Sequence, residues 1–358
     1  MTTLETVIPM VSVIIPTKKN TKVLQECLKS LQQLDYPKEL LEILVIIDSN
    51  DTDDSNAEDE LKHLIPKYPI YVFQMNGTPS YKRNFGVSNS QGTIIAFIDS
   101  DCIAPSQWVS KAVKHFEDPS VAVVGGPNLT PPENDWRQKC SGNILASKFG
   151  TGPMRSRYTP IGEKRTTKGL EIILCNMYAR KSTFEILQGF NEQLFPNEEN
   201  EFLHRVRTYE GTKTQKIVYD PMLYVYHNRR PIILEHSKQI FNYGVGRGKM
   251  IRLHPITAFP ASPLMIGFVF LAIAYPTLLI YQLITLTCSW CPNILFSWQI
   301  LYFLTIIFSL YFVGTVVYGI KWTIQHKRIP LLFLTPLMFF LSHFAYGCGI
   351  VKGLLSNV

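Results

Sequence analysis

Short apolar runs alternate with longer amphipathic stretches through residues 11–126. The apolar runs, each of strand length, are residues 11–16, 43–47, 70–73 and 93–98. Between them, apolar side chains recur at helical spacing in residues 21–34, 56–65 and 80–90. In the first of these stretches the expected buried face comprises Val23, Cys27, Leu28, Leu31 and Leu34. This alternation predicts an α/β domain whose mostly parallel sheet is covered by helices on both faces.

The pattern changes near residue 263. Three apolar stretches follow, at about 264–286, 294–320 and 331–351, and each reaches the roughly 20 residues that a helix needs to cross a bilayer. From Pro263 onward the chain has no Asp or Glu and only four Lys or Arg, whereas the first 262 residues hold all 28 acidic and 31 basic residues. We therefore predict a soluble domain (1–230), an amphipathic interfacial connector (231–262) and a membrane domain with three transmembrane helices (263–358).

The loops between the apolar stretches predict the orientation. Residues 287–293 are uncharged, whereas residues 321–330 carry Lys321, His326, Lys327 and Arg328. Basic loops stay on the cytoplasmic side, so we expect the large domain in the cytoplasm and the C terminus outside the plasma membrane. The N terminus shows no basic stretch followed by an apolar run, so no cleavable signal is expected. With 31 basic against 28 acidic residues, the first 262 residues have no strong basic footprint, and nucleic acid is not expected as a partner.

The seven cysteines show no overall disulfide or zinc-site spacing. Cys288 and Cys291 form an isolated Cys-x-x-Cys in the first loop. We favour an incidental pair, with a redox or metal role as the alternative.

Ligands of parallel α/β sheets lie beyond the carboxyl ends of the strands. At those ends are Pro16 and Thr17, Asp48, and the triplet Asp99-Ser100-Asp101. Two carboxylates one residue apart repel each other unless a cation lies between them. Their oxygens suit Mg²⁺ or Mn²⁺, which also bind phosphate. The triplet therefore predicts a divalent-metal site, although surface turns also carry such triplets.

Several segments resemble the family 2 glycosyltransferases, which have the GT-A fold. They are residues 11–17, 42–48, 82–86, 92–101, 177–181, 189–192 and 197–202, followed by Arg205. Their order and spacing agree over about residues 10–250. Within the family, the sequence is most similar to membrane-anchored bacterial and archaeal enzymes that build exopolysaccharide or lipid-linked oligosaccharide.

The resemblance implies a role for each matched site residue. Pro16, Thr17 and Asp48 would line the nucleoside pocket of a nucleotide-sugar donor. Arg83 and Asn84 would hold that side of the pocket and the diphosphate. Asp99 would face the ribose or donor sugar, and Asp101, with Asp99 beside it, would bind the Mg²⁺ or Mn²⁺ that bridges both phosphates.

An acidic cluster matches the family's motif for the catalytic base. The Asp of that motif corresponds to Glu199, and the longer side chain leaves the base between Glu199 and Glu198. Alternatively, the acids are the solvated start of a helix over 198–209, near its positive end.

Other segments depart from the family's pattern or leave two interpretations. The Gln-x-x-Arg-Trp motif of processive members is missing, which favours transfer of one or a few sugars. Glycines 244, 246 and 248 indicate a flexible basic segment that enters the membrane helices rather than a dinucleotide loop. Residues 148–168 form either an acceptor-side lid or a solvated loop.

The resemblance thus implies an inverting, metal-dependent hexosyltransferase at the cytoplasmic membrane face. Its donor would be a nucleotide-sugar, with UDP as the family's common carrier, and its acceptor a hydroxyl of a lipid-linked saccharide or growing polysaccharide. One alternative is a polyprenyl-phosphate glycosyltransferase, whose anionic acceptor needs no base. Another is an inactive, glycosyltransferase-like membrane scaffold.

Overall fold

The computed structural model describes residues 8–19, 21–48, 61, 63–64, 66–257, 261–287 and 295–356. The chain divides into two compact units, residues 1–134 with 145–229 and residues 135–144 with 230–358. The second unit thus includes residues 135–144, which the sequence-based division leaves in the N-terminal domain. The helix expected over 56–65 lies largely outside the described residues, as do Cys288 and Cys291.

Eight strands form the main sheet of the first unit, in the order β3-β2-β1-β4-β9-β6-β10-β8. They are β1 (Val11–Pro16), β2 (Leu41–Ile47), β3 (Ile70–Gln74), β4 (Ile94–Phe97), β6 (Val121–Gly125), β8 (Arg165–Thr166), β9 (Met177–Arg180) and β10 (Lys216–Tyr219). Strands β1 to β4 run parallel, whereas β9 is antiparallel to both of its neighbours. β1, β2 and β4 are buried along their whole length and are almost entirely apolar. Their two polar residues, Ser12 and Glu42, are hydrogen-bonded to each other at 2.6 Å. The predicted mostly parallel sheet is confirmed.

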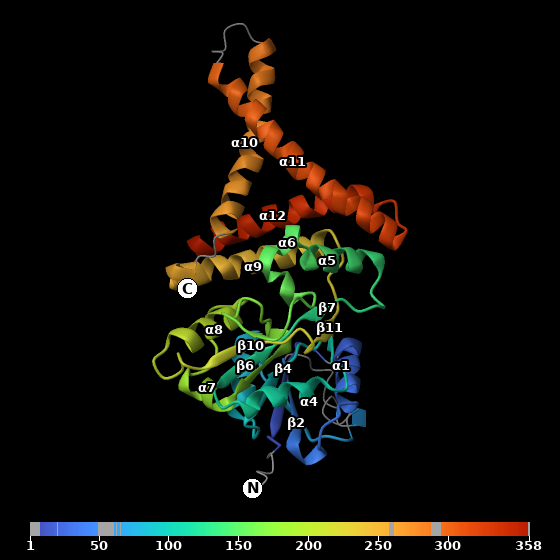
Figure 1. Ribbon diagram of the computed structural model, residues 1–358, viewed down its shortest axis with the longest axis vertical. Coiled ribbons are helices and arrows are strands. Elements are labelled where there is room, and N and C mark those ends of the chain that lie inside the picture. The colour runs from blue at the N-terminus through green and yellow to red at the C-terminus, as the bar shows by residue number, and fades with distance from the viewer. Residues whose placement is uncertain are drawn as a thin grey trace. The chain divides into compact units, whose positions relative to one another are not determined.

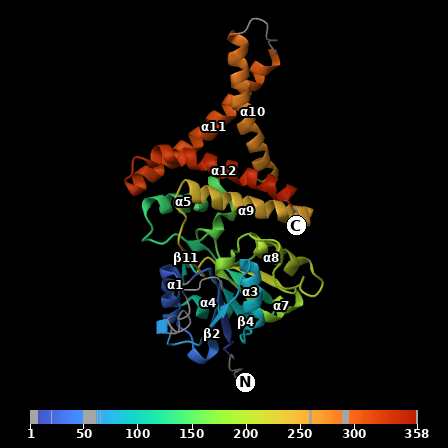
Figure 2. The same cartoon turned by 180° about the vertical axis from the view of Figure 1, so that it is seen from behind.

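Helices cover both faces of this sheet. They are α1 (Lys22–Gln32), α3 (Pro79–Ser88), α4 (Trp108–Val113), α7 (Lys181–Ile186) and α8 (Glu198–Thr208). The first unit also contains the short helix α6 (Lys148–Thr151), which has no buried residue. On one face, Gly86 of α3 packs directly on Ile14 and Ile46. On the other, the rings of Trp108 in α4 and Tyr178 in β9 lie 4.8 Å apart. Accordingly, α4 lies in front of the strands in Figure 1, and α3 lies in front of them in the reverse view of Figure 2.

The buried face predicted for α1 is wrong at one position. Val23 is exposed and Leu24 is buried. The helix begins at Lys22 after a Thr21 cap whose side chain accepts a hydrogen bond from the Leu24 amide, and this start turns Leu24 onto the face that also holds Cys27, Leu28 and Leu31.

A small second sheet stands beside the carboxyl end of β4. It consists of β5 (Cys102–Ile103), β11 (Val225–His227) and β7 (Asn128–Leu129), in that order. β5 and β11 are antiparallel, with His227 opposite Cys102. This pairing brings residue 227 next to the Asp99–Asp101 triplet.

The second unit is helical. Its elements are α5 (Trp136–Ala146, whose last two residues belong to the first unit), α9 (Leu234–Leu253), α10 (Ala261–Thr287), α11 (Leu295–His326) and α12 (Leu331–Leu355). Three spans are long and apolar enough to cross a membrane, Ser262–Thr285, Trp298–His326 and Leu331–Leu355, as predicted. The expected basic loop is shorter than residues 321–330, because α11 continues through Lys321 to His326. A lysine tolerates the end of an apolar helix because its long stem carries the charge to the interface.

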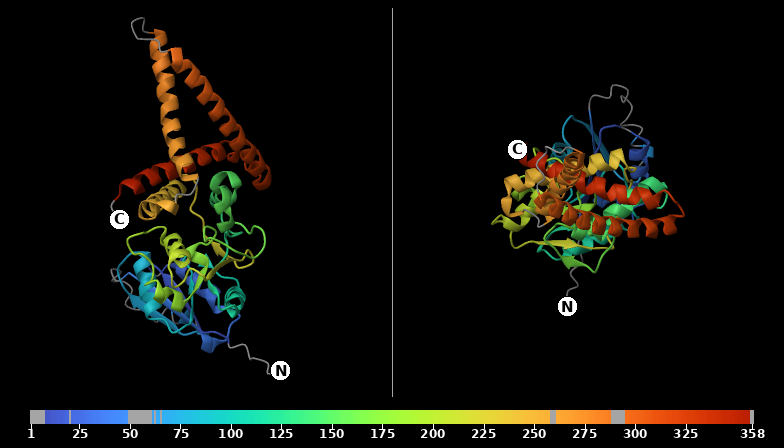
Figure 3. Two further views of the ribbon diagram at one scale, coloured as in Figure 1. Left: turned by 60° about the vertical axis from the view of Figure 1, so that its left-hand side comes forward. Right: turned by 90° about the horizontal axis from the view of Figure 1, so that it is seen from above.

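Glycines allow α9 and α12 to pack closely against each other, and the two helices lie side by side in all three views of Figures 1 and 3. A Cβ on Gly244 would lie 3.0 Å from the Gly349 Cα, and one on Gly248 would lie 2.8 Å from the Gly353 Cα. The two helices are therefore parallel and touch backbone to backbone, as small residues four apart allow. The interpretation of a flexible glycine segment was wrong, because these glycines lie inside a 20-residue helix.

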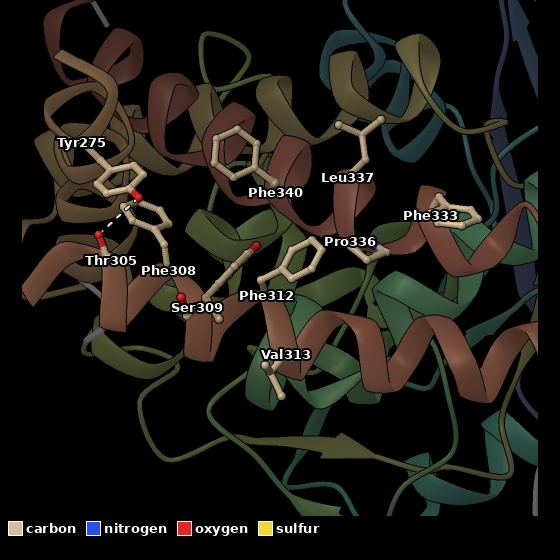
Figure 4. A pocket seen from close by; sticks show the side chains of 11 residues that line it. Tyr275, Thr305, Phe308, Ser309, Phe312, Val313, Phe333, Pro336, Leu337 and Phe340 are labelled. Atoms are coloured by element: carbon tan, nitrogen blue, oxygen red, sulfur yellow. Dashed lines mark hydrogen bonds between the residues drawn. The ribbon is translucent and has the colours of Figure 1, made fainter. Parts of the chain in front are cut away.

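A pocket of about 700 Å³ lies between α10, α11 and α12. Figure 4 shows its mostly aromatic and apolar lining, which includes Phe308, Phe312, Leu337 and Phe340. Its polar groups include the hydroxyl of Tyr275, which accepts a hydrogen bond from Thr305 at 3.3 Å.

Candidate active site

The carboxyl ends of β1 and β2 bring three of the predicted residues together. Pro16 is opposite Ile46, Thr17 donates its amide to the Ile46 carbonyl at 2.9 Å, and Asp48 follows β2 directly. Asp48 forms an ion pair with Lys82, at 2.6 Å between Oδ1 and Nζ. Lys82 also donates to the Thr17 carbonyl. Sequence reasoning missed Lys82, although it stands beside Arg83 in a quoted segment.

Arg83 connects the metal-site triplet to the acidic cluster. Its Nη2 donates to Asp99 Oδ1 at 2.6 Å, and its Nη1 donates to Glu198 Oε1 at 2.9 Å. The side chain is buried, and its Nε has no hydrogen-bond partner in the described part of the chain. Arg83 therefore connects Asp99 with Glu198, which lies 115 positions after Arg83 in the sequence.

Asn84 faces a different segment. Its amide nitrogen donates to the Phe190 carbonyl and to Glu192 Oε1, both at 2.9 Å. Its amide oxygen accepts from the Phe190 amide at 2.8 Å. Both ends of the Asn84 amide are thus used to hold the segment that follows Gly189, a residue with φ of +76°. The expected contact of Asn84 with the donor stays a prediction.

Asp99, Asp101 and His227 form a candidate metal centre. One ligand atom from each lies within 4.8 Å of the others, and the distance from Asp101 Oδ1 to His227 Nε2 is 3.0 Å. Two carboxylates with an imidazole fit a divalent ion, and the nitrogen ligand suits Mn²⁺ better than Mg²⁺. Sequence reasoning missed His227, because only the pairing of β11 with β5 brings it to the aspartates.

The charge of Asp101 also affects His227. Burial alone would lower the pKa of the imidazole, but the charge and hydrogen bond of Asp101 together with the charge of Cys175 outweigh burial and raise the pKa of His227 to about 9. The imidazolium must therefore lose a proton before His227 can bind a cation.

The acidic cluster is buried at the start of α8. Glu198 is 2% exposed, and its two oxygens accept from Arg83 and from the Asn197 amide. Burial raises the pKa of Glu198 to about 7, although the Arg83 charge opposes the rise. The alternative of a solvated helix start is wrong, because Glu199 and Glu201 are buried as well.

Glu199 uses one oxygen and leaves the other without a hydrogen bond within the described ranges. Its Oε1 accepts hydrogen bonds from Arg157 Nη1 at 3.2 Å and from the side-chain nitrogen Nδ2 of Asn200 at 2.8 Å. Arg157 comes from the 3-10 helix Gly152–Arg157 in the predicted lid or loop. It is buried and also donates to Asn200 Oδ1 at 2.7 Å. This part of residues 148–168 is thus anchored to the acidic cluster, which the sequence pattern does not indicate.

Comparisons with known proteins identify proteins that are similar to this chain. A profile of the family described as Glycosyl transferase family 2 matches residues 12–192. Over 126 residues the chain is 31% identical to the glycosyltransferase AglE of Haloferax volcanii, which covers 33% of this chain and 39% of that protein. Over 356 residues it is 25% identical to the dolichyl N-acetyl-alpha-D-glucosaminyl phosphate 3-beta-D-2,3-diacetamido-2,3-dideoxy-beta-D-glucuronosyltransferase of Methanococcus voltae, covering 97% of this chain and 98% of that one. Among solved structures, the mannosyltransferase PcManGT from Pyrobaculum calidifontis in complex with GDP-Man and Mn²⁺ is 18% identical with a TM-score of 0.49, covering 69% of this chain and 65% of that chain.

The family match spans just over half of the 358 residues. It contains nearly all of β1, the strands β2 and β4, and the aspartates that follow β2 and β4. The expected GT-A-like α/β domain followed by three apolar helices is confirmed. The chain belongs to glycosyl transferase family 2.

Proposed function

We propose that the protein is an integral membrane glycosyltransferase that moves a sugar from a nucleotide-sugar to a hydroxyl of a lipid-linked saccharide, with inversion, at the cytoplasmic face. The carrying observation is the chain of contacts from Asp99 through Arg83 to Glu198, which stands next to Glu199. One candidate metal ligand, Asp99, and one of the two base candidates, Glu198, are thereby held by one buried cation, as transfer between a donor and an acceptor in one site requires.

The donor side would be formed at the ends of β1 and β2. Pro16 and Thr17 would border the nucleoside, and Asp48, with Lys82 fixing one oxygen at 2.6 Å, would accept hydrogen bonds from base or ribose. The charge of Lys82 lowers the cost of holding Asp48 beside a diphosphate.

Asp101, with Asp99 and His227, would hold Mg²⁺ or Mn²⁺. When bound, such an ion stabilises the charge that develops on the leaving nucleoside diphosphate. The protein's own part is to fix Asp99 through Arg83 and to place His227 opposite β5. Asp99 and His227 would then be placed to orient the diphosphate end of the donor.

Glu199 is the better base candidate. Both oxygens of Glu198 are already used, whereas Glu199 retains one oxygen that can accept the proton of the acceptor hydroxyl. Arg157 and Asn200 hold the other Glu199 oxygen and so orient the carboxylate. Attack from the side opposite the leaving diphosphate would invert the anomeric carbon.

The nature of the acceptor is inferred from a relative and from the second unit. The Methanococcus voltae relative, aligned over nearly the whole length of both chains, is named for a dolichyl N-acetylglucosaminyl phosphate acceptor. The aromatic pocket between α10, α11 and α12 can hold part of a hydrocarbon chain. A polyprenyl-phosphate acceptor is the second candidate, and the buried, oriented Glu199 favours the hydroxyl over it.

Calorimetry and transfer assays on the detergent-purified full chain test this proposal. We expect UDP or GDP to bind only with Mn²⁺ or Mg²⁺ and Asp101→Asn to abolish that binding. Glu199→Gln should keep donor binding and lower transfer by about 10²–10⁴-fold. Glu210→Gln, at a carboxylate that is 83% exposed, is the matched control. Full transfer by Glu199→Gln to a polyprenyl phosphate would favour the second candidate, and absence of any nucleotide binding would favour an inactive scaffold.

A further inference from the structure

Two buried thiols lie on the far side of the His227 ring from the aspartates. Cys102 begins β5 directly opposite His227, and Cys175 lies in the 3-10 helix Leu174–Asn176 that precedes β9. Their exposed fractions are 0% and 2%. One sulfur from each and one ring nitrogen of His227 lie within 4.8 Å of one another. Directly opposed residues of an antiparallel pair share one face, which accounts for the approach of Cys102 to His227.

Asn128 on β7 shows which ring atom faces the thiols. Its amide nitrogen lies 3.2 Å from Cys175 Sγ and 3.3 Å from His227 Nδ1. The other ring atom, Nε2, lies 3.0 Å from Asp101. The imidazole therefore stands between a pair of carboxylates on one side and a pair of thiols on the other.

We propose that Cys102, Cys175 and His227 form a second, thiophilic metal site that binds Zn²⁺ and competes with the Asp99–Asp101 site for His227. Zinc prefers sulfur and nitrogen ligands in tetrahedral geometry, with Zn–S near 2.3 Å and Zn–N near 2.0–2.1 Å, so neighbouring ligands are roughly 3.5–3.8 Å apart. The present spacing, within 4.8 Å, needs only a small contraction. The oxygens of Asp99 and Asp101 suit harder ions instead.

The charges balance at this site. Binding releases one proton from each thiol and one from the imidazolium to solvent, and the two thiolates neutralise Zn²⁺ while the imidazole binds uncharged. A fourth position is left for water. A neutral imidazole has one free lone pair, so it can serve one ion at a time. Zn²⁺ on the thiol side therefore removes His227 from the other site, and by linkage each ion weakens the other by the same factor.

The binding experiment uses Cd²⁺ as a spectroscopic substitute for Zn²⁺ on the full chain in detergent. All samples carry Cys288→Ser and Cys291→Ser, because that pair supplies thiols of its own outside the described residues. We expect one equivalent of Cd²⁺ to produce the ultraviolet thiolate-to-cadmium band. Cys175→Ser should weaken this binding by at least about tenfold, a loss seen even when outer-shell partners are removed. Cys140→Ser is the matched control, because Cys140 is buried but belongs to neither metal-ligand group found among the described residues.

The competition experiment measures Mn²⁺ affinity by the spin resonance of free Mn²⁺, which requires no glycosyl transfer. Saturating Zn²⁺ should weaken Mn²⁺ binding by at least about tenfold, and Cys175→Ser should remove most of that effect. Cys102→Ala provides a second variant in case Cys175→Ser fails to fold.

Two results would overturn the inference. One is a cadmium band that is the same in both thiol-site variants as in Cys140→Ser. The other is a Zn²⁺ effect on Mn²⁺ that persists undiminished in those variants, because Zn²⁺ would then act directly at the aspartates. The competition part rests on the proposed function, but the cadmium band does not. A chain that binds Cd²⁺ as expected and never binds Mn²⁺ would count against the proposed function alone.

Discussion

Replacing Arg83 with Met should change how the stability of the first unit depends on pH. The substitution removes the cation between Asp99 and Glu198 and leaves Glu198 buried at 2% exposure. Breaking a buried pair by removing one partner typically costs about 3–5 kcal/mol. The cost should depend on pH, because Glu198 titrates within the accessible range.

The sign follows from the pKa of Glu198. Burial raises the pKa of Glu198 from an ordinary 4.5 to about 7. Between these two pH values the folded chain therefore holds a proton on Glu198 that the unfolded chain has lost. The resulting stability is complete below pH 4.5 and is lost as the pH rises through 7. The Arg83 charge lowers this pKa, so Arg83→Met should move it towards the 8–9 known for unpaired buried Glu. From pH 7 to 8 the parent should then lose roughly 0.4 kcal/mol and the variant roughly 1.0–1.3 kcal/mol.

Native-state hydrogen exchange of the β4 and β9 amides, at several pH values, measures this difference in the full chain. Glu198→Gln in both backgrounds is the control, since it removes the titrating group and should make the two pH profiles parallel. Profiles that are already parallel in the presence of Glu198 would refute the reasoning, because Arg83 would then have no electrostatic effect on that carboxyl group.

Two further substitutions test contacts that the structure identifies. Gly349→Ala should weaken the packing of α9 on α12 by about 1–3 kcal/mol and lower the melting temperature, because its Cβ would lie 2.2 Å from the Phe241 carbonyl oxygen. The control Gly267→Ala should leave the melting temperature unchanged, because nothing lies within 4 Å of its Cβ. Equal effects of the two substitutions would contradict this packing. Arg157→Lys should lower kcat without changing the KM for the donor, because lysine cannot donate to Glu199 and Asn200 in the fork geometry of arginine. A change confined to the donor KM would contradict a role of Arg157 in orienting Glu199.

Local patterns account for the elements of the fold that the sequence predicted correctly. β1, β2 and β4 are almost entirely apolar because both of their faces are buried, and that requirement is visible in composition alone. The absence of acidic residues beyond Pro263 likewise marks the apolar helices. The prediction that Val23 is buried failed for a local reason, because the residue at which α1 starts decides which residues share a face.

The glycines of α9 illustrate what a local pattern does not contain. The local sequence around Gly244 and Gly248 is equally compatible with a flexible linker and with a closely packed helix. Their function in packing depends on Gly349 and Gly353, which lie about a hundred residues later in α12. Only the approach of the two backbones distinguishes the two possibilities.

For the candidate site, the chain alone indicates residues that follow strands or match a family motif, such as Asp48, Asp101 and Glu199. It does not indicate Lys82, Arg157 or His227, whose importance arises from partners distant in sequence. His227 meets the aspartates through the pairing of β11 with β5, and Arg157 meets Glu199 across 42 residues. Strand formation is a property of a short segment, whereas a charge network requires that segments already be packed together. The physical reason is that burial and opposing charge, which set the geometry of these groups and the pKa of His227, exist only in the folded chain.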